Sequence, residues 1–257
     1  MPSWRGRLRD RYPPWTVLDD PPLDDPAAQV ARDAELAAAV ARPLDAPVAA
    51  PRYRVWTNRR CLVVTTRERR LPAFEAAAAA SARRGWPVVL RDSGGTAVPH
   101  LPTTLLLTLV LPRRPAPEPR ADEVFALLCE PAIEALADLG VSAGYGAVPR
   151  SFCDGRFNLV VNGRKIAGTA QRWRGGLPGH PVRAGYVLAH LALYVAADMR
   201  AATAAVNAFL QDAGSTDSFD PAAMTTVKAE APHLAGDEDD RTLLVRVRAA
   251  LLAVLRA

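Results

Sequence analysis

The sequence has few cysteines and no arrangement of them that suggests a metal or redox centre. Cys61, Cys129 and Cys153 are the three cysteines in 257 residues, and no two of them have the Cys-x-x-Cys spacing. His190 and His233 also lack the spacing of a metal-binding motif. We therefore expect reduced thiols and no structural metal.

Long apolar runs are missing as well. No segment reaches the length needed to cross a bilayer without a charged residue or a proline. The first residues, MPSWRGRLRDRYPPW, carry charges and prolines where a secretion signal needs an apolar stretch. The sequence therefore predicts a cytoplasmic protein that makes no contact with a membrane.

The excess of positive charge is small. The chain has 32 basic and 27 acidic residues, for a net charge of +5. The basic residues are dispersed and no RNA-binding motif accompanies them, so we expect no nucleic-acid partner. Apolar residues make up 49% and charged residues 23% of the chain, which is typical of a soluble globular protein. Its length fits one main domain.

The spacing of apolar residues predicts a mixture of helices and strands. The first 25 residues show neither periodicity and predict an extended arm laid over the domain. Helices are predicted at 26–42, 74–85, 121–140 with an interruption or kink near Pro131, 196–210 and 240–257. Strands are predicted within 51–66 across a possible Thr57-Asn58 turn, at 86–91 and 103–112, which can pair, at 157–161 and 164–173, and within 182–195 as one strand or two.

The segment RDSGGTAVPH, residues 91–100, lies between two predicted apolar strands. Paired glycines allow the backbone to approach a ligand, and successive amide groups can then surround a carboxylate or a phosphate. A pair of glycines between strands is also a common turn, so this segment alone leaves both interpretations open.

Asn162-Gly163 between two apolar segments is the strongest hairpin signal in the sequence, because both residues tolerate the positive φ of a type I′ turn. Lys165 follows two residues later, and strand alternation places Lys165, Ala167 and Thr169 on one face. A lone lysine on a strand usually faces solvent. Here the small residues 167–170 leave room for a ligand beside it, so a solvent-facing lysine and a functional one both stay open.

Together, LRDSGGTAVPH and FNLVVNGRKIAGTAQR resemble two motifs of the lipoate-protein ligase and octanoyltransferase family, which includes the biotin-protein ligase catalytic domain. In that family, Arg-Arg-x-x-Gly-Gly-Gly-x-Val-x-His is followed, after a long helix, by Asn-Asp-Leu-x-x-x-x-x-Lys-x-x-Gly-x-Ala. The likeness extends from residue 26 to about residue 210. It implies an α+β fold with a mixed, largely antiparallel sheet flanked by helices, like class II aminoacyl-tRNA synthetases and biotin synthetases. It also implies an arm at 1–25, a catalytic domain at 26–215 and a short helical C-terminal extension at 216–257.

The resemblance assigns roles to individual residues. Lys165 matches the catalytic lysine, which holds the acyl carbonyl and, in ligases, the adenylate phosphate. Thr96 stands where the family has its third glycine. The other positions matched to binding of the acyl group or nucleotide are Arg91, Ser93, Gly94, Gly95, Thr96, Ala97, His100, Asn158, Gly168, Thr169, Ala170 and His180.

The resemblance leaves three functions open. As a ligase, the protein would use ATP and Mg²⁺ to form an acyl-adenylate of lipoate or octanoate and pass the acyl group to a lysine of a lipoyl-domain acceptor. As a transferase, it would take the octanoyl group from acyl carrier protein onto Cys153 without ATP, although Cys153 can also be read as a half-buried thiol beside a loop. As a non-catalytic relative, it would only bind lipoate or the lipoyl domain. Of these three functions, the sequence predicts the ligase first, with the other two as alternatives.

Overall fold

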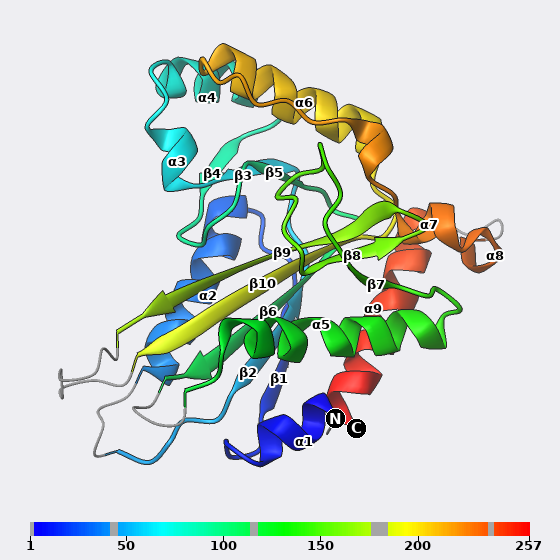
Figure 1. Cartoon of the computed structure of the whole chain (residues 1–257). Helices are drawn as coiled ribbons and strands as arrows, with labels where there is room; N and C mark the ends of the chain where they lie inside the picture. The colour runs from blue at the N-terminus through cyan, green and yellow to red at the C-terminus, as the bar shows by residue number, and fades with distance from the viewer. Residues whose placement is uncertain (1–2, 42–45, 114–117, 176–184, 236–238) are drawn as a thin grey trace.

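The computed structural model describes residues 3–41, 46–113, 118–175, 185–235 and 239–257. At its centre lies a seven-stranded sheet of order β1-β2-β6-β10-β9-β8-β7, seen in Figure 1. Strands β1 and β2 pair in parallel, and the other neighbours pair in antiparallel fashion. The strands are Thr16–Asp19 (β1), Arg52–Trp56 (β2), Thr104–Pro112 (β6), Gly144–Gly146 (β7), Asn158–Val161 (β8), Arg164–Arg174 (β9) and Tyr186–Tyr194 (β10).

A second, three-stranded sheet has the order β4-β3-β5. It consists of Cys61–Val64 (β3), Val88–Leu90 (β4) and Val98–His100 (β5). Strand β3 runs parallel to β4 and antiparallel to β5. The predicted pairing of the strand at 86–91 with the strand at 103–112 is therefore wrong, because β3 takes β4 as its partner. The predicted loop also contains β5, and β2 and β3 belong to different sheets.

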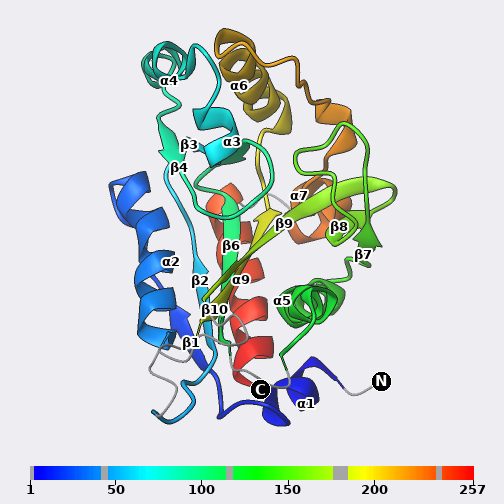
Figure 2. The same cartoon turned by 60° about the vertical axis from the view of Figure 1, so that its left-hand side comes forward.

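Helices cover both faces of the main sheet. Figure 2 shows α2 on one side of it and α5 and α9 on the other, while α4 and α6 lie over the small sheet. The helices are Trp4–Arg9 (α1), Pro26–Val40 (α2), Thr66–Arg69 (α3), Phe74–Arg83 (α4), Ala121–Asp138 (α5), Met199–Asp212 (α6), Val227–Glu230 (α7), Pro232–Ala235 (α8) and Asp240–Arg256 (α9), with a 3₁₀ turn at Pro221–Ala223.

Local sequence accounts for the ends of α2 and of the β8–β9 hairpin. Asp25 caps α2 by accepting a hydrogen bond from the amide of Ala27, and Pro26 occupies the first turn, where its missing N–H costs nothing. Asn162 and Gly163 have φ values of 49° and 74°, as a type I′ turn requires. Both the helix from residue 26 and the Asn-Gly hairpin are thus confirmed.

The fold class inferred from the sequence is confirmed: a mixed, largely antiparallel sheet is flanked by helices. Of the two forms predicted for the segment 182–195, the structure has one strand, β10. Helix α5 continues through Pro131 as one element, so Pro131 does not interrupt it. The N-terminal arm differs from its prediction, because it contains α1 and β1. The arm forms regular structure because β2 offers β1 a sheet edge and Trp4 is buried in the main core.

Two main apolar cores and one small cluster hold the layers together. The larger core joins the main sheet to α5 and α9, and the smaller one joins the small sheet to α4 and α6. The small cluster packs α2 against β6 and β10. Helix α9 belongs to the larger core through Leu243, Val247 and Leu251. The domain boundaries at residues 25 and 215 stay predictions. Across the described ranges, no helix has the length and apolar character to span a bilayer.

Candidate functional site

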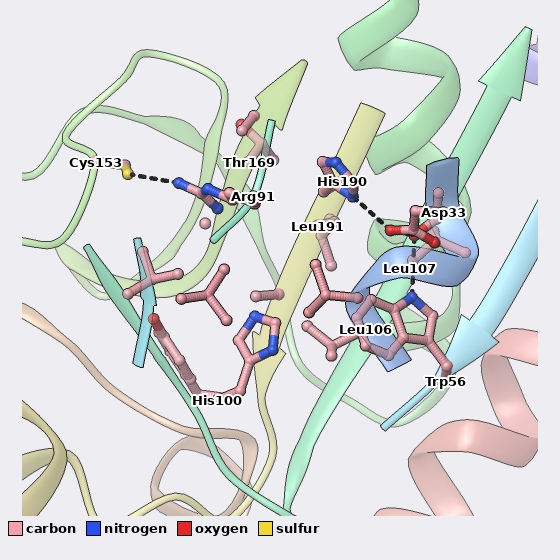
Figure 3. A pocket seen from close by; sticks show the side chains of 18 of the residues that line it. Asp33, Trp56, Arg91, His100, Leu106, Leu107, Cys153, Thr169, His190 and Leu191 are labelled. Carbon is pink, nitrogen blue, oxygen red and sulfur yellow. Dashed lines mark hydrogen bonds and ion pairs between the residues drawn. The ribbon is translucent and has the colours of Figure 1, made fainter. Parts of the chain in front are cut away.

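A pocket opens between the main sheet, α2 and the small sheet. It holds about 560 Å³ of empty space, a volume that includes its opening to solvent. Figure 3 shows Cys153 and Arg91 on one side of it and Asp33, Trp56 and His190 on the other. Between them the lining is mainly apolar and includes Val63, Val98, Leu106 and Ala192. A short aliphatic chain would fit the chemistry of this lining.

Cys153 lies in the loop between β7 and β8, in a backbone conformation with a φ of 49°. Its Sγ accepts a hydrogen bond from the backbone N–H of Thr96 at 2.9 Å and lies 3.2 Å from the Thr96 hydroxyl. Arg91 Nη2 approaches the same sulfur at 3.8 Å. Residues 91–100, here called the glycine loop, therefore direct the amide of Thr96 and the guanidinium of Arg91 at the thiol of Cys153. The segment between β7 and β8 that carries this thiol is here called the cysteine loop.

Gly95 allows this close approach. Its φ is 110°, and a Cβ at this position would lie 2.7 Å from Cys153 Sγ. Any side chain would therefore push the two loops apart. Thr96 also tightens the contact, because its hydroxyl accepts a hydrogen bond from the backbone N–H of Cys153 at 3.1 Å. The threonine in place of the family's third glycine thus joins the glycine loop to the cysteine loop.

Lys165 lies beneath the cysteine loop and is 0% exposed. Its Nζ donates hydrogen bonds to the backbone oxygens of Phe152 and, at 3.0 Å, of Cys153. Burial lowers the pKa of Lys165 to about 8, although a negative charge on Cys153 opposes this shift. Near neutral pH the amine can therefore both hold and release a proton.

The expected arrangement of side chains on β9 is wrong at one point. Val160 pairs with Lys165 and Leu159 pairs with Ala167, so Ile166 is an extra residue in a β-bulge. Ile166 and Ala167 both belong to the main core. Lys165 lies instead beside Gly168, where a Cβ would come within 3.0 Å of Nζ. The bulge, which has no signal in the sequence, turns the lysine toward the pocket.

The charges around Cys153 favour its thiolate. Burial raises the pKa of this thiol, but the positive charges of Arg91 and Lys165 and the hydrogen bonds from Thr96 lower it by more, so the pKa falls below its ordinary value. Burial alone raises the pKa of Cys61 to about 12, and it also raises that of Cys129. Among the three cysteines, only Cys153 is thus prepared to act as a nucleophile.

This difference predicts how the thiols react with iodoacetamide. We expect the alkylation rate of Cys153 to rise with pH to a midpoint below about 8.5, the ordinary pKa of a free thiol. Cys61 and Cys129 serve as internal controls and should stay unmodified in the folded protein. Peptide mass spectrometry after timed labelling measures all three sites, and a midpoint for Cys153 at or above 8.5 would contradict the account.

Of the other residues predicted from the sequence, some contact the groups around Cys153 and some line the pocket. Asn158 donates to the backbone oxygen of Cys153 at 2.5 Å and accepts from the amide of Thr169 at 3.1 Å, so it joins the cysteine loop to β9. Gly94 accepts a hydrogen bond from Arg91 through its backbone oxygen. Ser93 and Ala97 belong to the glycine loop itself and are buried. Those that line the pocket itself are Arg91, His100, Cys153, Lys165, Gly168, Thr169 and Ala170, whereas His180 lies outside the described residues.

His100 is neutral at physiological pH. Burial and the positive charges of Arg91 and His190 lower its pKa to about 3. Its Nδ1 accepts a hydrogen bond from Asn58 Nδ2 over 3.3 Å, and its ring meets Trp56 edge to face. The imidazole therefore forms part of the pocket wall and does not carry charge.

Sequence reasoning missed a polar group at the far side of the pocket. Asp33 Oδ1 accepts a hydrogen bond from Arg54 Nη1 at 2.7 Å. Its Oδ2 accepts one from the Thr108 hydroxyl at 3.0 Å and lies 3.1 Å from His190 Nδ1. Trp56 Nε1 donates to the same Thr108 hydroxyl. The only local signal was a single acidic residue on the apolar side of α2 and a single histidine within an apolar strand.

Removing the Asp33 carboxylate is expected to destabilise the fold. Arg54 is fully buried, and Asp33→Ala would leave part of its charge unpaired, at a cost of about 3 kcal/mol in the free energy of unfolding. Burial raises the pKa of Asp33, but its bonds to His190 and Arg54 bring it below 3.8. The stabilisation from Asp33 should therefore be fully present at pH values above the pKa that this carboxyl has in the unfolded chain. It should be lost as the pH falls through the lower pKa that the carboxyl has in the folded protein.

Denaturant unfolding of Asp33→Ala measures this cost. Asp25→Ala is the matched control, since it removes an exposed carboxylate that only caps α2, and it should lower stability by about 1 kcal/mol. If the two substitutions lowered the free energy of unfolding equally, the proposed contribution of the buried Asp33–Arg54 pair would be contradicted.

Comparisons with known proteins identify relatives of the chain. The family model described as lipoyl protein ligase A/B catalytic domain matches residues 25–244. A Kyrpidia tusciae protein named octanoyl-[GcvH]:protein N-octanoyltransferase is 39% identical over 211 residues, which are 81% of this chain and 70% of that protein. A Geobacillus kaustophilus protein of the same name is 32% identical over 175 residues, 65% of this chain and 59% of that protein.

A solved structure shares the fold. The crystal structure of lipoate-protein ligase A bound with ATP aligns with a TM-score of 0.63, at 18% identity, over 92% of this chain and 85% of that one. At this level of identity the likeness establishes the common fold.

Proposed function

Because the chain belongs to the lipoyl protein ligase A/B catalytic-domain family, we propose that it moves an octanoyl or lipoyl group to a lysine of a lipoyl-domain protein through a thioester on Cys153. Membership makes the chain an enzyme of the lipoate-protein ligase or octanoyl/lipoyl transferase class. The thioester route, the donor and the individual residue roles are the parts that we propose.

One observation carries the proposal: Cys153 Sγ receives an amide hydrogen bond, lies near two cationic side chains and faces an apolar pocket. A thiolate in such surroundings is a nucleophile for an acyl carbonyl, and the pocket suits the chain attached to that carbonyl. The amide of Thr96 donates its hydrogen bond to Cys153 Sγ and so is not available to a nucleotide phosphate. This contact favours the thioester route over the ATP-dependent route.

The first half of the reaction forms the thioester. The Cys153 thiolate attacks the acyl carbonyl, a C–S bond forms, and the bond from the carbonyl to the donor breaks. If the donor is an acylated lysine, the leaving amine needs a proton, and Lys165, with its pKa of about 8, can supply it.

The second half reverses these roles. An acceptor lysine attacks the thioester, the new amide forms, and Cys153 leaves as a thiolate. Neutral Lys165 takes the proton that the attacking amine releases, so its charge is restored. One amide replaces another over the full cycle, and the exchange therefore needs no ATP.

The donor that we propose is an octanoylated lipoyl-domain protein. The two named relatives are octanoyl-[GcvH]:protein N-octanoyltransferases, and the same type of donor would suit the amide exchange described above. An octanoyl thioester of acyl carrier protein is the other donor that the same nucleophile could use. Lipoate or octanoate with Mg-ATP is the substrate set of the ligase alternative.

Three parallel reactions separate these cases. The protein is incubated with an apo lipoyl domain and with octanoylated GcvH-type protein, octanoyl acyl carrier protein, or octanoate plus Mg-ATP, and the acceptor is weighed intact. We expect the acceptor to gain one octanoyl group from the octanoylated protein and none from octanoate with ATP. A gain that requires ATP would refute the thioester proposal and support the ligase.

A further inference from the structure

Tyr194 places a phenol in the reactive part of the pocket. It is the last residue of β10, it is 1% exposed, and it lines the same pocket as Cys153 and Lys165. Within the described part of the chain, its Oη forms no hydrogen bond. The oxygen is not fully enclosed by protein atoms, and tyrosines that are otherwise buried usually place their hydroxyl against a hydrogen-bond partner. A ligand in the pocket is therefore the natural partner of this group.

The surroundings of Tyr194 connect it to the nucleophile. Tyr194 and Phe152 belong to one buried cluster, and Cys153 packs against that cluster. Burial, together with a negative charge on Cys153, raises the pKa of the phenol well above its ordinary value. The phenol therefore keeps its proton and acts as a hydrogen-bond donor while Cys153 is ionised.

Most other donors around Cys153 already have partners. The Thr96 amide is bonded to Sγ, and Lys165 Nζ is bonded to two backbone oxygens of the cysteine loop. Arg91 Nη2 is bonded to the oxygens of Gly94 and Thr96, while its buried Nε has no partner among the described residues. The phenol of Tyr194 and the Nε of Arg91, by contrast, donate to no group among the described residues and can receive an oxygen from a substrate.

We propose that Tyr194 is a catalytic residue that donates a hydrogen bond from Oη to the carbonyl oxygen of the acyl group on Cys153. The oxygen gains negative charge in each tetrahedral intermediate, where a fixed donor stabilises it most. The proton stays on the phenol throughout, so the step adds nothing to the proton balance. This inference rests on the proposed function, because its ligand is the Cys153 thioester.

Tyr194→Phe removes the hydroxyl and little else, and the apolar ring can stay in place. We expect this variant to transfer octanoyl groups about 10²-fold more slowly, as when one oxyanion donor is lost. In addition, the infrared carbonyl stretch of a ¹³C-labelled octanoyl group on Cys153 should move to higher frequency, because a carbonyl that loses a hydrogen bond stiffens. Tyr186→Phe, the same change at the other end of β10 and outside the pocket lining, is the control and should alter neither value.

The outcomes separate this inference from the proposed function. If the wild-type protein acquires no octanoyl group on Cys153, the proposed function fails. If it does, and Tyr194→Phe leaves the rate and the carbonyl frequency unchanged, the role of Tyr194 is refuted. A slower rate with an unchanged carbonyl frequency would also refute it, since a merely structural tyrosine would produce that result.

Discussion

Replacing Cys153 with serine should lower the rate of octanoyl transfer by at least about 10³-fold. Serine fills nearly the same space and can keep the hydrogen bond from the Thr96 amide, but its hydroxyl does not ionise under conditions in which this thiol does. The loss should therefore appear in the chemical step while the fold is preserved. Intact-mass measurement of the octanoylated acceptor over time gives the rate.

Cys61→Ala is the matched control. Cys61 is fully buried in β3, and burial raises the pKa of its thiol to about 12. Its removal should leave transfer within a few-fold of the unaltered protein. Transfer by Cys153→Ser at a rate similar to that of Cys61→Ala would exclude a thioester on Cys153 and return the ligase route to first place.

Replacing Lys165 with methionine should lower transfer by about 10²- to 10⁴-fold. Methionine has a similar length, but it carries no charge and cannot hold the backbone oxygens of Phe152 and Cys153. Two effects follow from this single change. The thiol loses a neighbouring positive charge, and the exchange loses the group that gives and takes the amine proton.

The two effects of Lys165→Met can be measured separately. Without the lysine, the pH midpoint for alkylation of Cys153 should rise, because one of the charges that lower its pKa is gone. Lys228→Met, which removes a half-exposed lysine paired with Asp240, is the control and should change neither the midpoint nor the rate. Full transfer activity in Lys165→Met would remove this residue from the mechanism.

Local sequence predicted the central hairpin because the determinants of that element are local. Asn162 and Gly163 specify the turn, and the apolar segments beside it supply β8 and β9. The glycine loop could likewise be recognised from residues 91–100. Its partner could not, because the contact between Thr96 and Cys153 joins positions 57 residues apart.

The rest of the site depends on contacts that no short segment encodes. Asp33 and His190 come from α2 and β10, and they meet only because both elements border the same pocket. The bulge at Ile166, which orients Lys165, follows from pairing with β8 and not from alternation along β9. Strand β5 was read as loop because its three residues are stable as a strand only beside β3.

The thioester on Cys153 can be observed directly. The protein is mixed with an octanoylated GcvH-type donor without acceptor, quenched in acid, digested and analysed by peptide mass spectrometry. We predict one octanoyl group on the peptide that contains Cys153, removable by hydroxylamine and lost when apo lipoyl domain is added before the quench. Product formation with no octanoyl group on that peptide at any time point would contradict the account.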